Sequence, residues 1–194
     1  MKNTLWLALL LAALLSACNR TPKPFDPASA AAAKAQLDVL RDSVDTRWTQ
    51  MMASDDAKIV ATAQMISELE RNPSTDKQLL QQLSRANSRL QARRYQQLTM
   101  QSAQIDQYDM AQDSLLTSLR GILQAPGAAA PGTTVQNTFA TIGEYDGLVV
   151  GYRVQYDRAA KQFNNYLQLH RNELQSLGGK YGQLTPLPLF ELQE

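Results

Sequence analysis

Two side chains in this sequence are the only ones of their kind: Cys18 is the single cysteine and His170 the single histidine in 194 residues. One thiol allows neither a disulfide within these residues nor a metal site of several thiolates, and one imidazole does not allow a site of several histidines. Ser176 follows His170 by six residues, nearly on the opposite side of a helix, so a serine–histidine pair for acyl transfer is not expected. We therefore expect no catalytic residue, no metal site and no cofactor.

The chemistry left to Cys18 is indicated by the residues before it. Lys2 provides a positive start, and residues 5–15 form an unbroken apolar run that is too short to span a bilayer permanently. Small residues follow, so the pattern predicts a secretory signal peptide over residues 1–17. The letters LSAC, which end in Cys18, also resemble a bacterial lipobox, in which the nucleophilic sulfur forms a thioether to a lipid. The alternative is an ordinary core thiol behind a simple signal.

Lipid on Cys18 would make the membrane the first partner of this chain. Two or three acyl chains such as palmitate, each buried methylene contributing about 0.8 kcal/mol, give stable rather than transient anchoring. Residue 19 is Asn and not Asp, the residue that signals retention at the inner membrane of Gram-negative bacteria. In such an organism we expect the protein in the cell envelope, at the periplasmic face of the outer membrane.

Composition separates a short tether from one helical domain. Residues 18–27 contain three prolines and no periodicity, which predicts an extended spacer, and residues 28–194 form one domain of ordinary size. Removal of residues 1–17 takes away one basic residue, Lys2, and leaves as many basic as acidic side chains. This balance gives no basic surface for nucleic acid, so none is expected as a partner.

Apolar residues recur at helical spacing along most of the domain and predict an all-α fold, a long antiparallel bundle of about four helices. The first stripe ends near Met52, and Ser54 with two acidic residues after it resembles a helix start or marks a kink. A second stripe stops at Pro73. The next stripe thins between Leu90 and Leu98, which indicates either an exposed bend or a continuous long helix.

The last third of the chain combines a loop, a long helix and an apolar tail. Residues 124–134 hold two Pro-Gly pairs and predict a loop between antiparallel neighbours. Residues 137–177 keep spacings of three and four over more than four heptads, which predicts one long helix that ends at two glycines. The irregular tail that follows is rich in Leu, Pro and aromatic residues, so we expect it to pack on the bundle.

Residues 153–167 carry a motif within that last helix. They read R-x-x-Y-[ND]-x-x-[VA]-x-x-[YF]-N-x-x-[IL], with the defining side chains Arg153, Tyr156, Asp157, Phe163 and Asn164. This pattern, with a glycine, an aromatic residue and a Pro-containing stretch ending in Phe-Glu after it, resembles the carboxy-terminal signature of the LemA family. The family usually has Phe-Pro where His170 and Arg171 stand. The resemblance implies a long helical bundle fixed to a membrane by its amino terminus, and it implies little chemistry.

The spacing of the motif residues supports an interpretation that does not depend on the family resemblance. Tyr156 and Phe163 are seven residues apart and should face neighbouring helices, with Asp157 and Asn164 beside them to form hydrogen bonds across the interface. We interpret these residues as packing residues, because an aromatic stripe at helical spacing is usually core. The alternative is a pocket between helices that uses Arg153, Tyr156 and Asp157.

Three glycines spaced by four, Gly143, Gly147 and Gly151, precede the motif. Each costs a helix about 1 kcal/mol against alanine, so something should offset them. A second helix could approach closely there, either within the bundle or from a partner, or the helix start could be loosely ordered. The sequence as a whole thus indicates a membrane-anchored scaffold or adaptor with an envelope protein as partner and no catalysis. The alternative is a small-ligand-binding protein or enzyme of the envelope.

Overall fold

The computed structural model describes residues 27–125 and 132–190, and within these ranges every regular element is a helix. Four are long: α2 (Pro27–Glu70), α3 (Lys77–Arg93), α4 (Ser102–Leu123) and α5 (Thr133–Leu169). Two are short, α6 (Arg171–Ser176) and α7 (Gly179–Gly182). The prediction of an all-α bundle with four long helices is confirmed.

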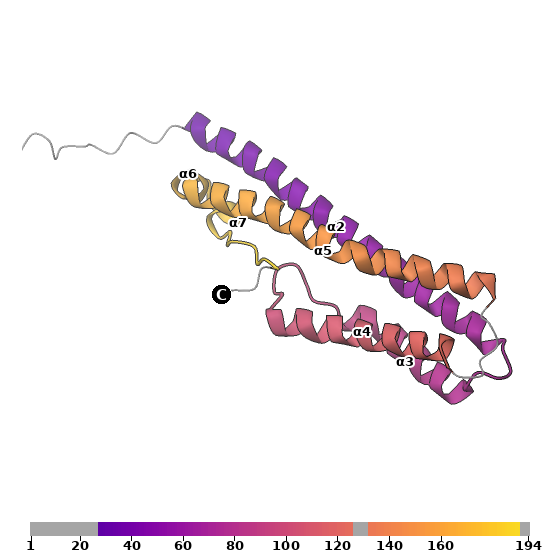
Figure 1. The fold of residues 1–194 in the computed structure, drawn as a ribbon. Coiled ribbons are helices and arrows are strands. Elements are labelled where there is room, and N and C mark those ends of the chain that lie inside the picture. The colour runs from indigo at the N-terminus through magenta and orange to yellow at the C-terminus, as the bar shows by residue number, and fades with distance from the viewer. Residues whose placement is uncertain (1–26, 126–131, 191–194) are drawn as a thin grey trace, which may run out of the picture.

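The arrangement has two parts along one axis (Figure 1). Helices α2 and α5 run antiparallel to each other as a long pair, and at 1.5 Å per residue the 44 residues of α2 extend about 66 Å. The α3–α4 hairpin lies along only the part of this pair where α2 ends and α5 begins. Helices α6 and α7 and the tail after them lie at the other part, beside the first half of α2.

Helix α2 passes Ser54 without interruption, so of the two alternatives there, a helix start and a kink, the helix start is wrong. Its buried positions continue at helical spacing through this region, but Asp55, Lys58 and Thr62 stand where apolar residues would be expected. A polar side chain can occupy a buried position when it has hydrogen-bond partners, and the contacts described below supply them. The apparent break in the apolar stripe is therefore a change from apolar to polar side chains at the buried positions of one helix.

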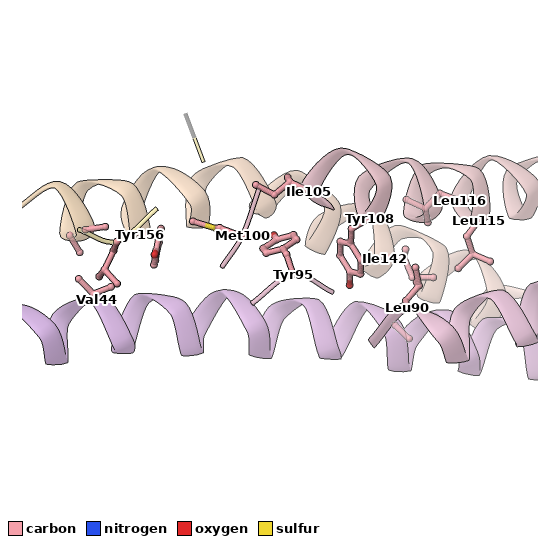
Figure 2. Close-up of a cluster of buried hydrophobic side chains, with 14 of the residues drawn as sticks. Val44, Leu90, Tyr95, Met100, Ile105, Tyr108, Leu115, Leu116, Ile142 and Tyr156 are labelled. Atoms are coloured by element: carbon pink, nitrogen blue, oxygen red, sulfur yellow. The ribbon is translucent and has the colours of Figure 1, made fainter. Parts of the chain in front are cut away.

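The chain does turn between Leu90 and Leu98, as one of the two alternatives predicted. Helix α3 ends at Arg93, and Arg94 has extended backbone with φ −64° and ψ 138°. The connection is not simply exposed, because Tyr95 and Met100 point into the core between α2 and the other helices (Figure 2). Figure 2 shows part of the core as a line of side chains from Val44 and Tyr156 to Leu90 and Leu115, and the core continues beyond it to residues such as Leu37 and Leu80.

The last helix is shorter than its periodicity suggested. Helix α5 ends at Leu169, and His170 separates it from α6. Gly178 and Gly179 then have φ values of +65° and +55°, a left-handed conformation that glycine adopts without the penalty of a Cβ atom. This turn sends the tail back along α5. The tail is irregular and packs on the bundle as expected, with Leu187 only 5% exposed.

Candidate functional site

The 153–167 motif occupies the inner face of α5. Tyr156 and Phe163 are 0% and 1% exposed and lie in the core shared with α2. Asp157 follows Tyr156, and Asn164 follows Phe163, so each polar side chain is rotated by one residue from a buried aromatic ring. This rotation points both polar groups at the carboxy-terminal tail and not, as the spacing suggested, at a neighbouring helix.

Asn164 holds the backbone of the tail at Leu187. Its Nδ2 donates to the Leu187 carbonyl oxygen at 2.8 Å, and the Leu187 N–H donates to Asn164 Oδ1 at 2.7 Å. A side-chain amide carries one acceptor and one donor group, so it can pair with a peptide unit as another strand would. The pairing satisfies two backbone groups of a segment that forms no regular structure.

Tyr156 and Asp157 bind the next residues of the tail. The Tyr156 hydroxyl donates to the Pro188 carbonyl oxygen at 3.2 Å, and the Phe190 N–H donates to Asp157 Oδ1 at 2.9 Å. Burial, followed by the nearby charge of Asp157, raises the pKa of Tyr156 and keeps its hydroxyl protonated as a donor. The motif side chains Tyr156, Asp157 and Asn164, together with the tail residues 187–190 that they bind, form what we call the tail clasp.

Arg153 connects the tail clasp to α4. Its Nη1 and Nη2 donate to Asp109 Oδ2 and Oδ1 at 2.8 and 2.7 Å, and its guanidinium lies 5.1 Å from the centre of the Phe190 ring. Nη2 also donates to the Tyr95 hydroxyl at 3.3 Å. Burial, the largest single influence, acts to lower the pKa of Arg153, but the hydrogen bonds and charges of Asp109 and Tyr95 together outweigh it, so the pKa is raised. The guanidinium thus stays charged and contacts three other segments: α4, the connection between α3 and α4, and the tail.

Five aromatic rings meet where these segments join. Trp48 of α2 lies 5.4 Å from Tyr156 and 6.0 Å from Tyr95 between ring centres, in edge-on contacts, and stacks on Phe190 at 6.4 Å. Tyr95 also contacts Tyr108 edge-on at 5.7 Å. Such pairs contribute about 0.5–1.5 kcal/mol each beyond the area they bury. Phe190 belongs to the tail, so the five-ring cluster is complete only when the tail is docked.

A second polar cluster was not predicted from the sequence. Asp55, 8% exposed, accepts hydrogen bonds from the Tyr108 hydroxyl and from Gln112 Nε2, the latter at 2.7 Å, and pairs with Arg94 Nη1 at 2.9 Å. Arg94 also pairs with Asp56 Oδ1 at 2.8 Å. Burial and the hydrogen bond to Asp55 raise the pKa of Tyr108. The signal in the sequence was the helical spacing of Asp55, Lys58 and Thr62 in continuation of the apolar stripe.

A pocket of about 400 Å³ lies next to the tail clasp. Its walls come from the first half of α2, from Phe163 of α5, from Leu98 and from residues 180–188. Arg153, Tyr156 and Asp157 do not line this pocket. Each of the three instead binds another part of the chain.

The three glycines of α5 lie in regular helix, well inside Thr133–Leu169. A Cβ atom built at Gly143, Gly147 or Gly151 would meet no atom within 4 Å. No other helix of the described part of the bundle therefore approaches these glycines closely. Contact with a partner helix stays a prediction.

Some expectations concern residues outside the described ranges, and others concern metal sites and membrane-spanning helices. Cys18 and residues 18–26 lie outside them, so the lipid site and the tether stay predictions. Within the described residues, no cluster of three or more His, Cys, Asp or Glu side chains could hold a metal ion. None of the helices that the structure describes is long and apolar enough to cross a membrane.

Comparison with known proteins gives no relative from which a function could be transferred. No protein-family model, no curated protein and no solved structure matches this chain. The assignment of function therefore depends on the contacts described above and on the sequence motifs.

Proposed function

We propose that this protein is a lipid-anchored scaffold or adaptor of the bacterial cell envelope, similar to proteins of the LemA family. The observation that supports this proposal best is what the side chains of the 153–167 motif bind. Arg153 binds Asp109, while Tyr156, Asp157 and Asn164 bind backbone groups of residues 187–190. These side chains hold segments of the protein together.

The shape of the bundle also supports a scaffold. Helix α2 begins at Pro27, shortly after Cys18, and continues for 44 residues. Lipid on Cys18 would hold the α6–α7 part of the bundle near the membrane and place the α3–α4 hairpin farther away. We propose the periplasmic face of the outer membrane as the site of anchoring in a Gram-negative cell, with the membrane and an envelope protein as partners.

The competing function is an envelope enzyme or ligand-binding protein that uses Arg153, Tyr156 and Asp157. It requires at least one of these groups to be accessible. Tyr156 and Asp157 are 0% and 8% exposed, and the guanidinium of Arg153 has both its Nη atoms bound. These contacts favour the scaffold.

The test compares the wild type with Cys18→Ser. Intact mass and cell fractionation should find acyl chains on the wild-type protein and place it in the membrane fraction, while Cys18→Ser should be unacylated and released. Chemical crosslinking of the wild-type membrane fraction should then trap one defined envelope protein, and reciprocal capture from that protein should recover this chain. A wild-type protein that is soluble and unmodified would contradict the anchor. Acylation without any reciprocal capture would contradict the adaptor role.

A further inference from the structure

The pocket beside the tail clasp has two kinds of wall. Leu37 and Phe163, which are 2% and 1% exposed, provide apolar surface from α2 and α5. Pro186 and Pro188 of the tail provide further, stiff apolar surface. The volume of about 400 Å³ lies in the range of roughly 300–1,000 Å³ that is typical of small-molecule sites.

Charged side chains also line the pocket, among them Asp38 and Lys180, and Lys34 lies next to Asp38 without lining the pocket itself. Lys34 Nζ pairs with Asp38 Oδ2 at 2.8 Å, and the Tyr181 hydroxyl donates to both Asp38 oxygens at 3.1 and 3.2 Å. Asp38 therefore has its negative charge compensated. The Tyr181 ring has two ammonium groups near it, Lys34 Nζ at 5.2 Å and Lys180 Nζ at 5.0 Å from its centre.

Lys180 is a cation of this pocket that forms no ion pair within the described residues, although its charge acts on Asp38. In the described ranges no carboxylate lies within ion-pair distance of it, whereas Arg41, the other lining cation, pairs with Asp45 at 2.9 Å and lies 6.0 Å from the Phe163 ring. The pocket thus combines an apolar wall with a rim where positive charge exceeds negative charge. A ligand that matches both must be apolar over most of its length and anionic at one end.

We propose that this pocket binds an amphipathic anion, an acyl chain with a carboxylate or phosphate head group. The head lies near Lys180, and the chain lies against Leu37, Phe163 and the prolines of the tail. This binding site goes beyond the scaffold function and does not require lipid on Cys18. Because residues 180–188 form one wall, the bound chain also stabilises the docked tail.

Photocrosslinking of the full-length chain in phosphatidylcholine vesicles tests the site. The probe is dodecanoate that carries a diazirine, and mass spectrometry locates the crosslinked peptides. We expect labels in residues 37–41 and 180–188, competition by unlabelled dodecanoate or dodecyl phosphate, and far weaker competition by dodecanol. Stronger competition by dodecyl phosphate assigns the site to a phospholipid-type head, and stronger competition by dodecanoate assigns it to a free fatty acid. Labels spread over the bundle, or equal competition by dodecanol, would overturn the proposal.

A matched pair of variants separates the pocket from the overall charge. Lys180→Glu should reduce specific labelling about five- to tenfold, as expected when an attraction of about 1 kcal/mol is lost. Arg158→Glu changes the net charge of the chain by the same amount at an exposed position of α5 and should leave the labelling unchanged. Circular dichroism of both variants checks that the helices are intact. Equal losses in the two variants, or no loss in Lys180→Glu, would remove Lys180 from the site.

Discussion

The two halves of α2 pack against the rest of the protein in different ways. In the first half, Leu37 and Val44 meet α5 and the tail through apolar contacts, and the polar groups of the tail clasp lie at the edge of the core. In the second half, Asp55, Lys58 and Thr62 bury polar groups against α3, α4 and α5. We call the first contact the apolar seam. We call the second the polar seam, because there the polar side chains are buried among apolar ones such as Met65 and Ile66.

The difference shows how each seam obtains its stability. Apolar contacts gain free energy in proportion to the area they bury, and they tolerate any neighbour of suitable shape. A buried ion pair loses much of its attraction to the cost of removing both charges from water, but it penalises every arrangement in which one partner is missing. We therefore expect the apolar seam to supply stability and the polar seam to fix the position of the α3–α4 hairpin.

The largest effect is expected in the apolar seam. Phe163→Ala should lower the free energy of unfolding by about 3 to 5 kcal/mol, because it removes a buried ring and leaves a cavity between α2 and α5. Chemical denaturation measures the change, and Gln162→Ala, at the exposed neighbouring position, is the control. An unchanged midpoint in Phe163→Ala would place this ring outside the core.

The polar seam should depend on one carboxylate more than on the other. Asp55→Ala leaves Tyr108 and Gln112 without their acceptor and should cost about 3 kcal/mol. Asp56→Ala removes the half-exposed partner of the same Arg94 and should cost less than about 1 kcal/mol. Both values come from denaturation curves. Equal costs for the two variants would show that burial of Asp55 has no special role.

The tail clasp should respond to Asn164 and not to the asparagine next to it. Asn164→Ala removes both hydrogen bonds to Leu187 and should cost about 2 kcal/mol, because the tail loses its backbone partners. Asn165→Ala, at an exposed position, should have no effect. Carboxypeptidase digestion provides a second measurement and should shorten Asn164→Ala faster. Similar digestion of both variants would argue against the clasp.

The smallest effect is a dependence on alkaline pH. The pKa of Tyr108 is higher in the folded protein than in the unfolded chain, so the folded state retains its proton longer and stability is lost as pH rises above about 10. Tyr108→Phe removes this dependence. We expect its difference in unfolding free energy from the wild type to shrink by about 1 kcal/mol between about pH 8 and pH 10.5. A constant difference would contradict the raised pKa.

Periodicity was sufficient to predict the helical class and the burial of the motif rings. It failed at Ser54 because the buried stripe of α2 continues in polar residues, whose partners include Gln112 on α4, Asp146 on α5 and Arg94 after α3, far away in sequence. The spacing of Asp157 and Asn164 indicated hydrogen bonds across an interface but not their partner. That partner is backbone of the tail, and a backbone group leaves no residue type in a sequence pattern.

Hydrogen exchange at the tail tests the central claim, that the motif of α5 holds residues 187–190. In the wild-type protein the amides of Leu187 and Phe190 should be protected, because they donate to Asn164 and Asp157. Asn164→Ala should abolish the protection of the Leu187 amide and leave amides in the middle of α5 protected. Exchange of both tail amides in the wild type at the rate of an unstructured peptide would contradict the account.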